Sequence, residues 1–193
     1  MIRLANAAFG LAVSLVGLGS SAAEPQVKRN IVYYDVSSST PQAIRAELDR
    51  LGPIHAADKR RFDATTRWHV KWTYRYRNVG QDCAIARVST TVDVTITMPR
   101  LKADSPRPQA VARAFEEFSE KLMQHEEGHA QIGIDAAKRI EAGMLDLKPH
   151  PTCDALGRAA NALGQSLIKE ANQKDAEYDA RTQHGRGQGA RFP

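Results

Sequence analysis

The sequence predicts an α+β fold in which a small antiparallel sheet packs against long helices. Two segments in the first half, residues 68–77 and 91–98, alternate apolar and polar side chains with the period of a β-strand. The second half repeats apolar residues at spacings of three and four, which is the period of a helix that packs on a core. Strands followed by helices, rather than a regular alternation of the two, are typical of the α+β class.

The first half begins with a short strand and a short helix. Residues 31–36 are apolar and aromatic, as expected for a strand. Thr40 supplies a side chain that caps helices, and Pro41 fits the first helical position. Gly52, followed by a proline, ends this helix. The turn-rich residues 78–82 separate the two alternating segments, so we expect those segments to form an antiparallel pair.

Two long helices are predicted in the second half. The first follows Pro108 and ends near Leu147, before a Pro-His-Pro sequence that breaks it. The second carries apolar residues at helical spacing from Leu156 to Ala171. Residues 181–193 are rich in Gly, Gln and Arg and show no apolar period, so we expect a polar segment after this helix.

The first residues have the features of an export signal. Arg3 precedes an uncharged apolar run, and small residues lie around Ala23, where a signal peptidase could cut. The run is shorter than the roughly 20 residues that span a bilayer, although an uncleaved anchor is the alternative. We expect residues 1–23 to be a signal peptide and 24–193 a single zincin-like peptidase domain, periplasmic or secreted, with no stable membrane span after cleavage.

The cysteines and the charge balance narrow the function classes. The chain has two cysteines, Cys83 and Cys153, which in an exported protein are typical of one disulfide; two buried thiols are the alternative. The formal net charge is +5, but the lysines and arginines form no block. No basic patch with interleaved aromatic residues is present, so we expect no nucleic-acid partner.

The first long helix contains the motif H-E-x-x-H at residues 125–129. His125 and His129 are one helical turn apart on the same face, so their imidazoles can bind one zinc ion. Glu126 lies beside that face, where it can act as general base toward a zinc-bound water and then as acid toward the leaving amine. Two core histidines satisfied by hydrogen bonds are the alternative.

Gly128, inside the motif, is unfavourable in a helix by about 1 kcal/mol relative to Ala. This cost favours a close approach of a substrate or of another backbone segment at this position. A glycine without importance on a solvated face is the alternative.

The third zinc ligand lies outside the motif, because a catalytic zinc site generally takes three protein ligands. The candidates elsewhere in the chain are His55, His69, His150, Asp179 and His184. We prefer His184, because it lies in the polar segment of residues 178–185, which we expect after the second helix, and this helix can return toward the first. Asp179 and His150 are its rivals. Tyr178, Arg181 or Arg186 of the same region could stabilise an oxyanion.

Short motifs are spread along the whole chain: Tyr33-Tyr34, Gly52-Pro53, Thr66-x-Trp68, Cys83, Met98-Pro99, His125-Glu126-x-Gly128-His129, Cys153 and Tyr178-Asp179-x-x-Thr182-x-His184-Gly185 with Gln188-Gly189. In these residues the chain resembles a family of uncharacterised bacterial proteins that are predicted to be secreted zinc-dependent proteases. The resemblance covers most of residues 24–193. It implies a zincin-like peptidase whose C-terminal segment joins the site, and it implies no particular substrate.

The sequence thus predicts an exported zinc metallopeptidase that hydrolyses peptide bonds. Glu126 and Tyr178 are the expected catalytic residues, and the expected Zn²⁺ ligands are His125, His129 and His184. The substrate would be a peptide or protein, and cell-wall peptides are candidates because an exported protein meets them. The alternative is a non-catalytic zinc-containing binding module of the cell envelope, which would keep the histidines but gain nothing from Glu126.

Overall fold

The computed structural model describes residues 24–55 and 59–193, and this part of the chain confirms the α+β class. Its strands are β1 (Gln26–Val36), β2 (Thr65–Val79) and β3 (Asp82–Leu101). Its helices are α1 (Pro41–Leu51), α2 (Gln109–Leu145) and α3 (Cys153–Thr182), followed by the 3-10 turn η1 (Arg186–Gln188). The expected signal peptide, residues 1–23, lies outside the described residues.

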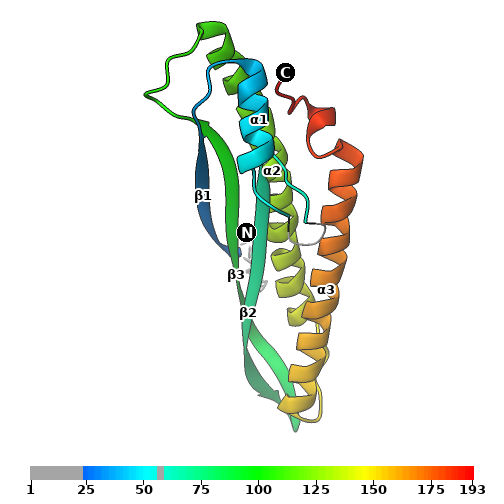
Figure 1. Ribbon diagram of the computed structural model, residues 1–193. Helices are drawn as coiled ribbons and strands as arrows, with labels where there is room; N and C mark the ends of the chain where they lie inside the picture. Colours follow the sequence, from blue (N-terminus) through cyan, green and yellow to red (C-terminus); the bar gives the residue numbers. More distant parts are fainter. Residues whose placement is uncertain (1–23, 56–58) are drawn as a thin grey trace, which may run out of the picture.

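The strands form a three-stranded sheet in the order β1-β3-β2. β2 and β3 make the predicted antiparallel hairpin, in which Gly80 adopts a φ of 62° at the turn. β1 pairs with β3 in parallel, from Gln26 opposite Thr91 to Val36 opposite Leu101. The sheet is therefore mixed rather than antiparallel throughout. The reason is that α1 keeps the chain at one end of the sheet, where β2 starts, so β3 returns in the direction of β1 (Figure 1).

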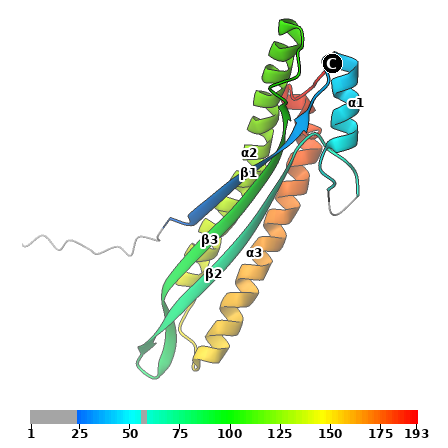
Figure 2. The same cartoon turned by 60° about the vertical axis from the view of Figure 1, so that its left-hand side comes forward.

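Helices α2 and α3 lie side by side along one face of the sheet, and α1 packs at one end (Figures 1 and 2). The alternation of β3 turns its apolar side chains toward these helices, where Val92, Val94 and Ile96 are fully buried. Phe118 of α2 and Leu156 of α3 complete this core from the helical side. Among the described residues, none of the helices combines the length and apolarity that a membrane span requires.

Tryptophans of β2 contact glycines of the helices. A Cβ on Gly133 of α2 would lie 2.6 Å from the Trp68 ring, and a Cβ on Gly164 of α3 would lie 2.8 Å from the Trp72 ring. Only glycine lets the helix backbone come so close to the sheet. Trp68 Nε1 also donates a hydrogen bond to Asp175 of α3 at 3.3 Å. Trp68 therefore holds α2 and α3 in position next to the H-E-x-x-H motif, and Trp72 holds α3 farther along its length.

Helix α3 is longer than the apolar stripe predicts. The face that it turns toward α2 is apolar as far as Ala171 and then continues as Asp175, Asp179 and Thr182. We expected a polar segment that included Asp179 after the helix, but Asp179 lies within α3. His184 does lie after the helix, in the left-handed conformation with a φ of 53°. The apolar stripe ends in the sequence because the positions of α3 that face α2 become polar next to the H-E-x-x-H motif.

The predicted disulfide between Cys83 and Cys153 is confirmed, and it joins the end of the β2–β3 hairpin to the start of α3. His150 lies beside it, because its backbone exchanges hydrogen bonds of 2.7 and 2.9 Å with Cys83. This end of the molecule is remote from the motif, since His125 lies about 30 Å along α2 from Leu145 at 1.5 Å per residue. His150 is therefore not close to the motif histidines.

Candidate metal centre

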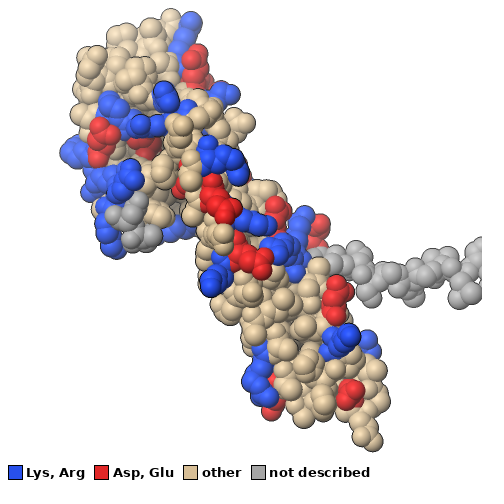
Figure 3. All heavy atoms as spheres, turned by 90° about the vertical axis from the view of Figure 1, so that its right-hand side faces the viewer, with Lys and Arg blue, Asp and Glu red and all other residues tan. Residues whose placement is uncertain are grey.

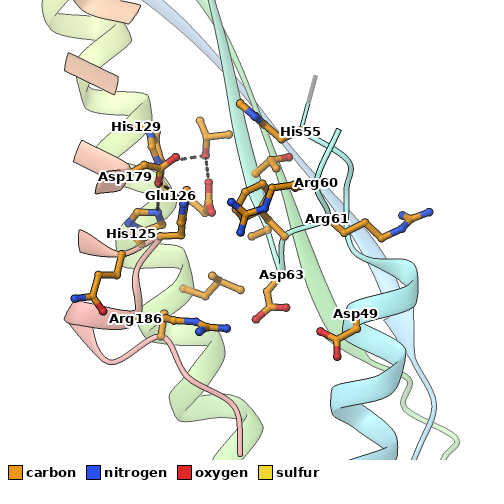
Figure 4. A pocket seen from close by; sticks show the side chains of 18 of the residues that line it. Asp49, His55, Arg60, Arg61, Asp63, His125, Glu126, His129, Asp179 and Arg186 are labelled. Carbon is orange, nitrogen blue, oxygen red and sulfur yellow. Dashed lines mark hydrogen bonds and ion pairs between the residues drawn. The ribbon is translucent and has the colours of Figure 1, made fainter. Parts of the chain in front are cut away.

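The H-E-x-x-H motif lies on the buried face of α2, opposite the last turns of α3 and the start of β2 (Figure 4). His125, Glu126 and His129 are 2%, 3% and 6% exposed, so three polar side chains share one desolvated region. Buried polar groups are stable only with partners. Their partners therefore define what this region can do.

Three ligand atoms form a compact triangle. The Nε2 atoms of His125 and His129 are 3.2 Å apart, and Oδ1 of Asp179 lies 3.2 Å from the first and 3.1 Å from the second. Tetrahedral zinc, with metal–nitrogen bonds of about 2.0–2.1 Å, separates its ligand atoms by roughly 3.3 Å. The triangle thus has the size of one face of such a site. Among the described residues, these three side chains make up the group that could hold a metal ion.

The outer nitrogens of both histidines have hydrogen-bond acceptors. His129 Nδ1 lies 2.9 Å from Oδ1 of Asp175, and His125 Nδ1 lies 2.9 Å from Oε1 of Gln188. Both contacts place a proton on Nδ1, so the Nε2 atoms are the ones that face the triangle. Orientation of this kind is what metal-binding histidines have in general.

The electrostatics of the triangle favour a positive charge. Burial disfavours charged His129, but hydrogen bonds to Asp175 and Asp179 override burial and raise the pKa of His129 to about 10. Burial acts to raise the pKa of Asp179, yet its contacts with His125 and His129 hold that pKa well below the usual range. A proton on His129 thus occupies a place that suits a cation.

Glu126 is held beside the triangle by β2. Its carboxylate accepts a hydrogen bond from Thr66 Oγ1 at 2.7 Å, and the same hydroxyl lies 3.0 Å from the backbone oxygen of Glu126. Burial raises the pKa of Glu126, against the opposing effect of the Thr66 hydrogen bond. A carboxylate with a raised pKa, next to a cation site and a cavity, is suited to take and return a proton.

His184, the preferred third ligand in the sequence, lies next to the triangle. Its Nδ1 is 3.2 Å from Oδ1 of Asp179, and its ring lies 4.7 Å from that of Phe62. The side chain is 42% exposed, whereas that of Asp179 is 27% exposed. Asp179, its rival, is the residue that completes the triangle with the motif histidines. The role of His184 as a ligand stays a prediction.

Tyr178 packs against both motif histidines. Its ring stacks on His125 at 5.0 Å between centroids and meets His129 edge-on at 4.9 Å. A Cβ on Gly128 would lie 2.3 Å from the Tyr178 hydroxyl, so the close approach at Gly128 is made by a side chain, whereas we expected a substrate or a backbone segment. Arg181 lies over the same ring, at 5.7 Å from its centroid. The oxyanion role of Tyr178 stays a prediction.

A cavity of about 340 Å³ opens beside the triangle. Residues of α2, of the end of α3 and of the C-terminal segment form one wall, and α1 with His55 and residues 60–64 forms the other (Figure 4). Arg45 of α1 forms ion pairs with Asp49 and Asp63, and Arg61 donates to the backbone oxygen of Gly52 at 2.7 Å. Arg186 also lines the cavity. Figure 3 shows Lys and Arg side chains gathered at this end of the molecule, with fewer acidic ones among them.

Four residues of the site were not singled out by the motif alone. Thr66 and Gln188 belong to the shared short motifs, but nothing in their spacing links them to residues 125–129. Asp175 and Asp179 had a usable signal, since they are one helical turn apart, like the histidines that they contact. An acidic pair at this spacing on the helix that packs against the motif indicates a matching set of partners.

These features define an α+β protein with two helix-borne histidines and a carboxylate gathered at one point. The chain belongs to the family described as bacterial protein of unknown function (DUF922), which matches residues 31–185. The matched segment includes the motif, Asp179 and His184 and ends before Gln188. No curated protein and no solved structure matches the chain. A bacterial domain with a disulfide is compatible with export.

Proposed function

We propose that the protein is an exported zinc-dependent metallopeptidase. The observation that carries this proposal is the triangle of two imidazole nitrogens and one carboxylate oxygen, each edge of which is 3.1–3.2 Å. Nitrogen and oxygen donors in this number are what catalytic zinc takes from a protein. His125, His129 and Asp179 would hold the ion, while Asp175 and Gln188 would fix the orientation of the imidazoles.

The residues around the triangle supply the remaining chemistry. Bound zinc lowers the pKa of a water to about 7 and polarises a carbonyl. Glu126 takes the proton from the attacking water and delivers it to the leaving amine. Thr66 holds the Glu126 carboxylate in place for both transfers, because its hydroxyl binds that group directly. The adjacent cavity gives a peptide access to this carboxylate.

A non-catalytic zinc module is the second candidate, and one observation favours it. His184 Nδ1 lies 3.2 Å from Asp179 Oδ1, so this imidazole could complete a closed set of four ligands. Structural zinc sites are closed in this way, whereas catalytic sites keep one position open. The burial of Glu126 next to an open cavity supports the enzyme instead, because a structural site has no use for a proton acceptor there.

Metal analysis and turnover of one variant test the proposal. The purified mature protein should contain about one zinc ion per chain and should cleave members of a broad peptide library. Glu126→Gln should retain zinc and lose turnover by several orders of magnitude, because only the proton transfer is removed. Thr66→Val, which keeps the size of the side chain, should lose part of the rate.

The outcomes separate the candidates. Zinc in both proteins with turnover in neither supports the binding module. Equal turnover in the wild type and Glu126→Gln excludes Glu126 as the base. Absence of zinc after purification and after reconstitution contradicts both candidates.

A further inference from the structure

The cavity beside the triangle contains carboxylates that already have partners. Asp49 and Asp63 lie on the wall that α1 and the residues after it form, and both make ion pairs with Arg45. Asp175, Asp179 and the motif glutamate on the other wall bind histidines or a threonine, as described above. The acidic side chains that line the cavity are thus engaged within the protein. A side chain of the cavity that is available to bind a ligand is therefore to be sought among its arginines.

Arg186 is such a side chain. Its guanidinium lines the cavity, and its side chain makes neither an ion pair nor a hydrogen bond with any residue that the structure describes. Other arginines of the cavity differ, since Arg45 and Arg61 bind protein oxygens. In Figure 4 the Arg186 side chain extends from the C-terminal turn toward the opposite wall, in the direction of Asp63.

The backbone holds Arg186 next to the motif. Gly185 has a φ of 79°, and a Cβ at this position would lie 3.0 Å from the His125 ring. The chain therefore passes the imidazole in contact with it, and the next residue is Arg186. On the opposite wall, Arg60 lies over the Phe62 ring at 5.4 Å from its centroid. A group bound by Arg186 would thus be held in the cavity that the triangle also lines.

We propose that Arg186 binds a carboxylate of the peptide substrate and thereby selects acidic peptides. This inference rests on the proposed function. A guanidinium presents a planar pair of donors that matches the two oxygens of a carboxylate. A carboxylate bound here would place a nearby amide bond over the triangle, beside Glu126. The carboxylate can come from an Asp or Glu side chain or from the free C-terminus of the peptide, and the two sources share the same recognition.

Paired peptides test this assignment. One set carries Glu, or Gln as its neutral match, at each successive position; a second set carries a free or an amidated C-terminus. The wild type should cleave one charged form with a kcat/KM about 10- to 100-fold above that of its neutral match, as expected for a hydrogen-bonded ion pair. Which set shows the preference identifies the source of the carboxylate.

Two variants and a control assign the preference to Arg186. Arg186→Gln should abolish the difference between charged and neutral peptides, mainly through KM for the charged one. Arg186→Lys should keep part of this difference, because lysine has the positive charge but lacks the planar pair of donors. Arg191→Gln removes an exposed arginine of the same C-terminal segment and should keep the full preference. A wild type without a preference, or a preference unchanged in Arg186→Gln, overturns the inference.

Binding measurements keep this inference separate from the peptidase proposal. Zinc-loaded Glu126→Gln is titrated with the same peptide pairs by calorimetry, with and without Arg186→Gln. Selective binding of the charged peptide that depends on Arg186, without turnover by the wild type, supports the inference and contradicts the peptidase. Turnover without selectivity contradicts the inference alone. Absence of selective binding and of selective turnover overturns it whatever the activity.

Discussion

Two histidines that share one helix face have different hydrogen-bond partners in this protein. His129 donates to the carboxylate of Asp175, whereas His125 donates to the neutral amide of Gln188. The amide also donates to the Tyr178 hydroxyl at 3.2 Å, and that hydroxyl lies 3.3 Å from the backbone oxygen of His125. The Gln188 oxygen accepts from His125, and the Gln188 nitrogen donates to Tyr178, whose hydroxyl can in turn donate to the backbone of His125. This ring of contacts therefore defines the tautomer of His125 before any metal binds.

Removal of the Gln188 amide should weaken zinc binding. Gln188→Ala leaves His125 Nδ1 without its acceptor, and loss of such a partner lowers metal affinity by about 10–100-fold. Gln188→Glu keeps an acceptor and should retain most of the affinity. Gln173→Ala, an exposed glutamine of α3, serves as the control. Competition with a chelator measures all four proteins, and unchanged affinity in Gln188→Ala would show that the contact does not orient the ligand.

The identity of the third zinc ligand can be tested by comparing variants of Asp179 and His184. The triangle assigns this role to Asp179, so Asp179→Asn should lower zinc affinity by more than about 100-fold, beyond the loss expected for an indirect partner. His184→Ala removes only a contact with Asp179 and should cost about 10–100-fold or less. The same chelator titration decides between them. A larger loss in His184→Ala would restore the assignment that the sequence favours.

At the scale of the elements, helices α2 and α3 pack close to the sheet because their glycines contact tryptophan rings of β2. This arrangement could not be read from the sequence. The alternation of residues 68–77 predicts that Trp68 and Trp72 lie on one face of a strand, but not which helical positions they meet. In the same way, the apolar period of α3 ends where Asp175 and Asp179 replace apolar residues. The pairing of His125 with His129 could be predicted because the two residues are one turn apart in the same helix. The carboxylates that contact them belong to α3, and their position depends on how the helices pack.

Alanine at two helical glycines should have different effects on stability. Gly164→Ala places a Cβ 2.8 Å from the rigid Trp72 ring and should lower the free energy of unfolding by about 1–3 kcal/mol. Gly143→Ala meets the flexible Leu163 side chain at 3.1 Å, so the better helix propensity of alanine should leave stability unchanged or raise it by up to about 1 kcal/mol. Urea denaturation measures both. Equal effects would mean that the tryptophan contact does not limit helix packing.

At the scale of the whole molecule, the disulfide and the candidate metal centre lie at different ends of the α2–α3 pair (Figure 1). The sequence predicts the α+β class and the antiparallel hairpin because both follow from local periods. It does not predict the parallel pairing of β1, because that depends on where α1 returns the chain. The parallel register joins Val36 to Leu101, which are far apart in the chain. Long-range pairings of this kind leave little trace in residue spacing.

Loss of the disulfide should affect stability and not the site. Cys83 and Cys153 are separated by 70 residues, and a cross-link of this span stabilises by up to about 4 kcal/mol in the chain-entropy model. The double variant Cys83→Ser/Cys153→Ser should unfold at lower urea concentration, yet bind zinc with the affinity of the parent while folded. A parallel fall in zinc affinity would show that the two ends are coupled.

The three corners of the triangle come from the middle of α2 and the last turns of α3, segments that meet only when the helices have packed. On the proposed function, an ion at this point binds the native chain and has no equivalent place on the unfolded one. Free zinc at 100 times its dissociation constant would then add about 2.7 kcal/mol to the free energy of unfolding. The availability of the metal outside the cell membrane would thereby set how long each molecule survives unfolding and proteolysis there.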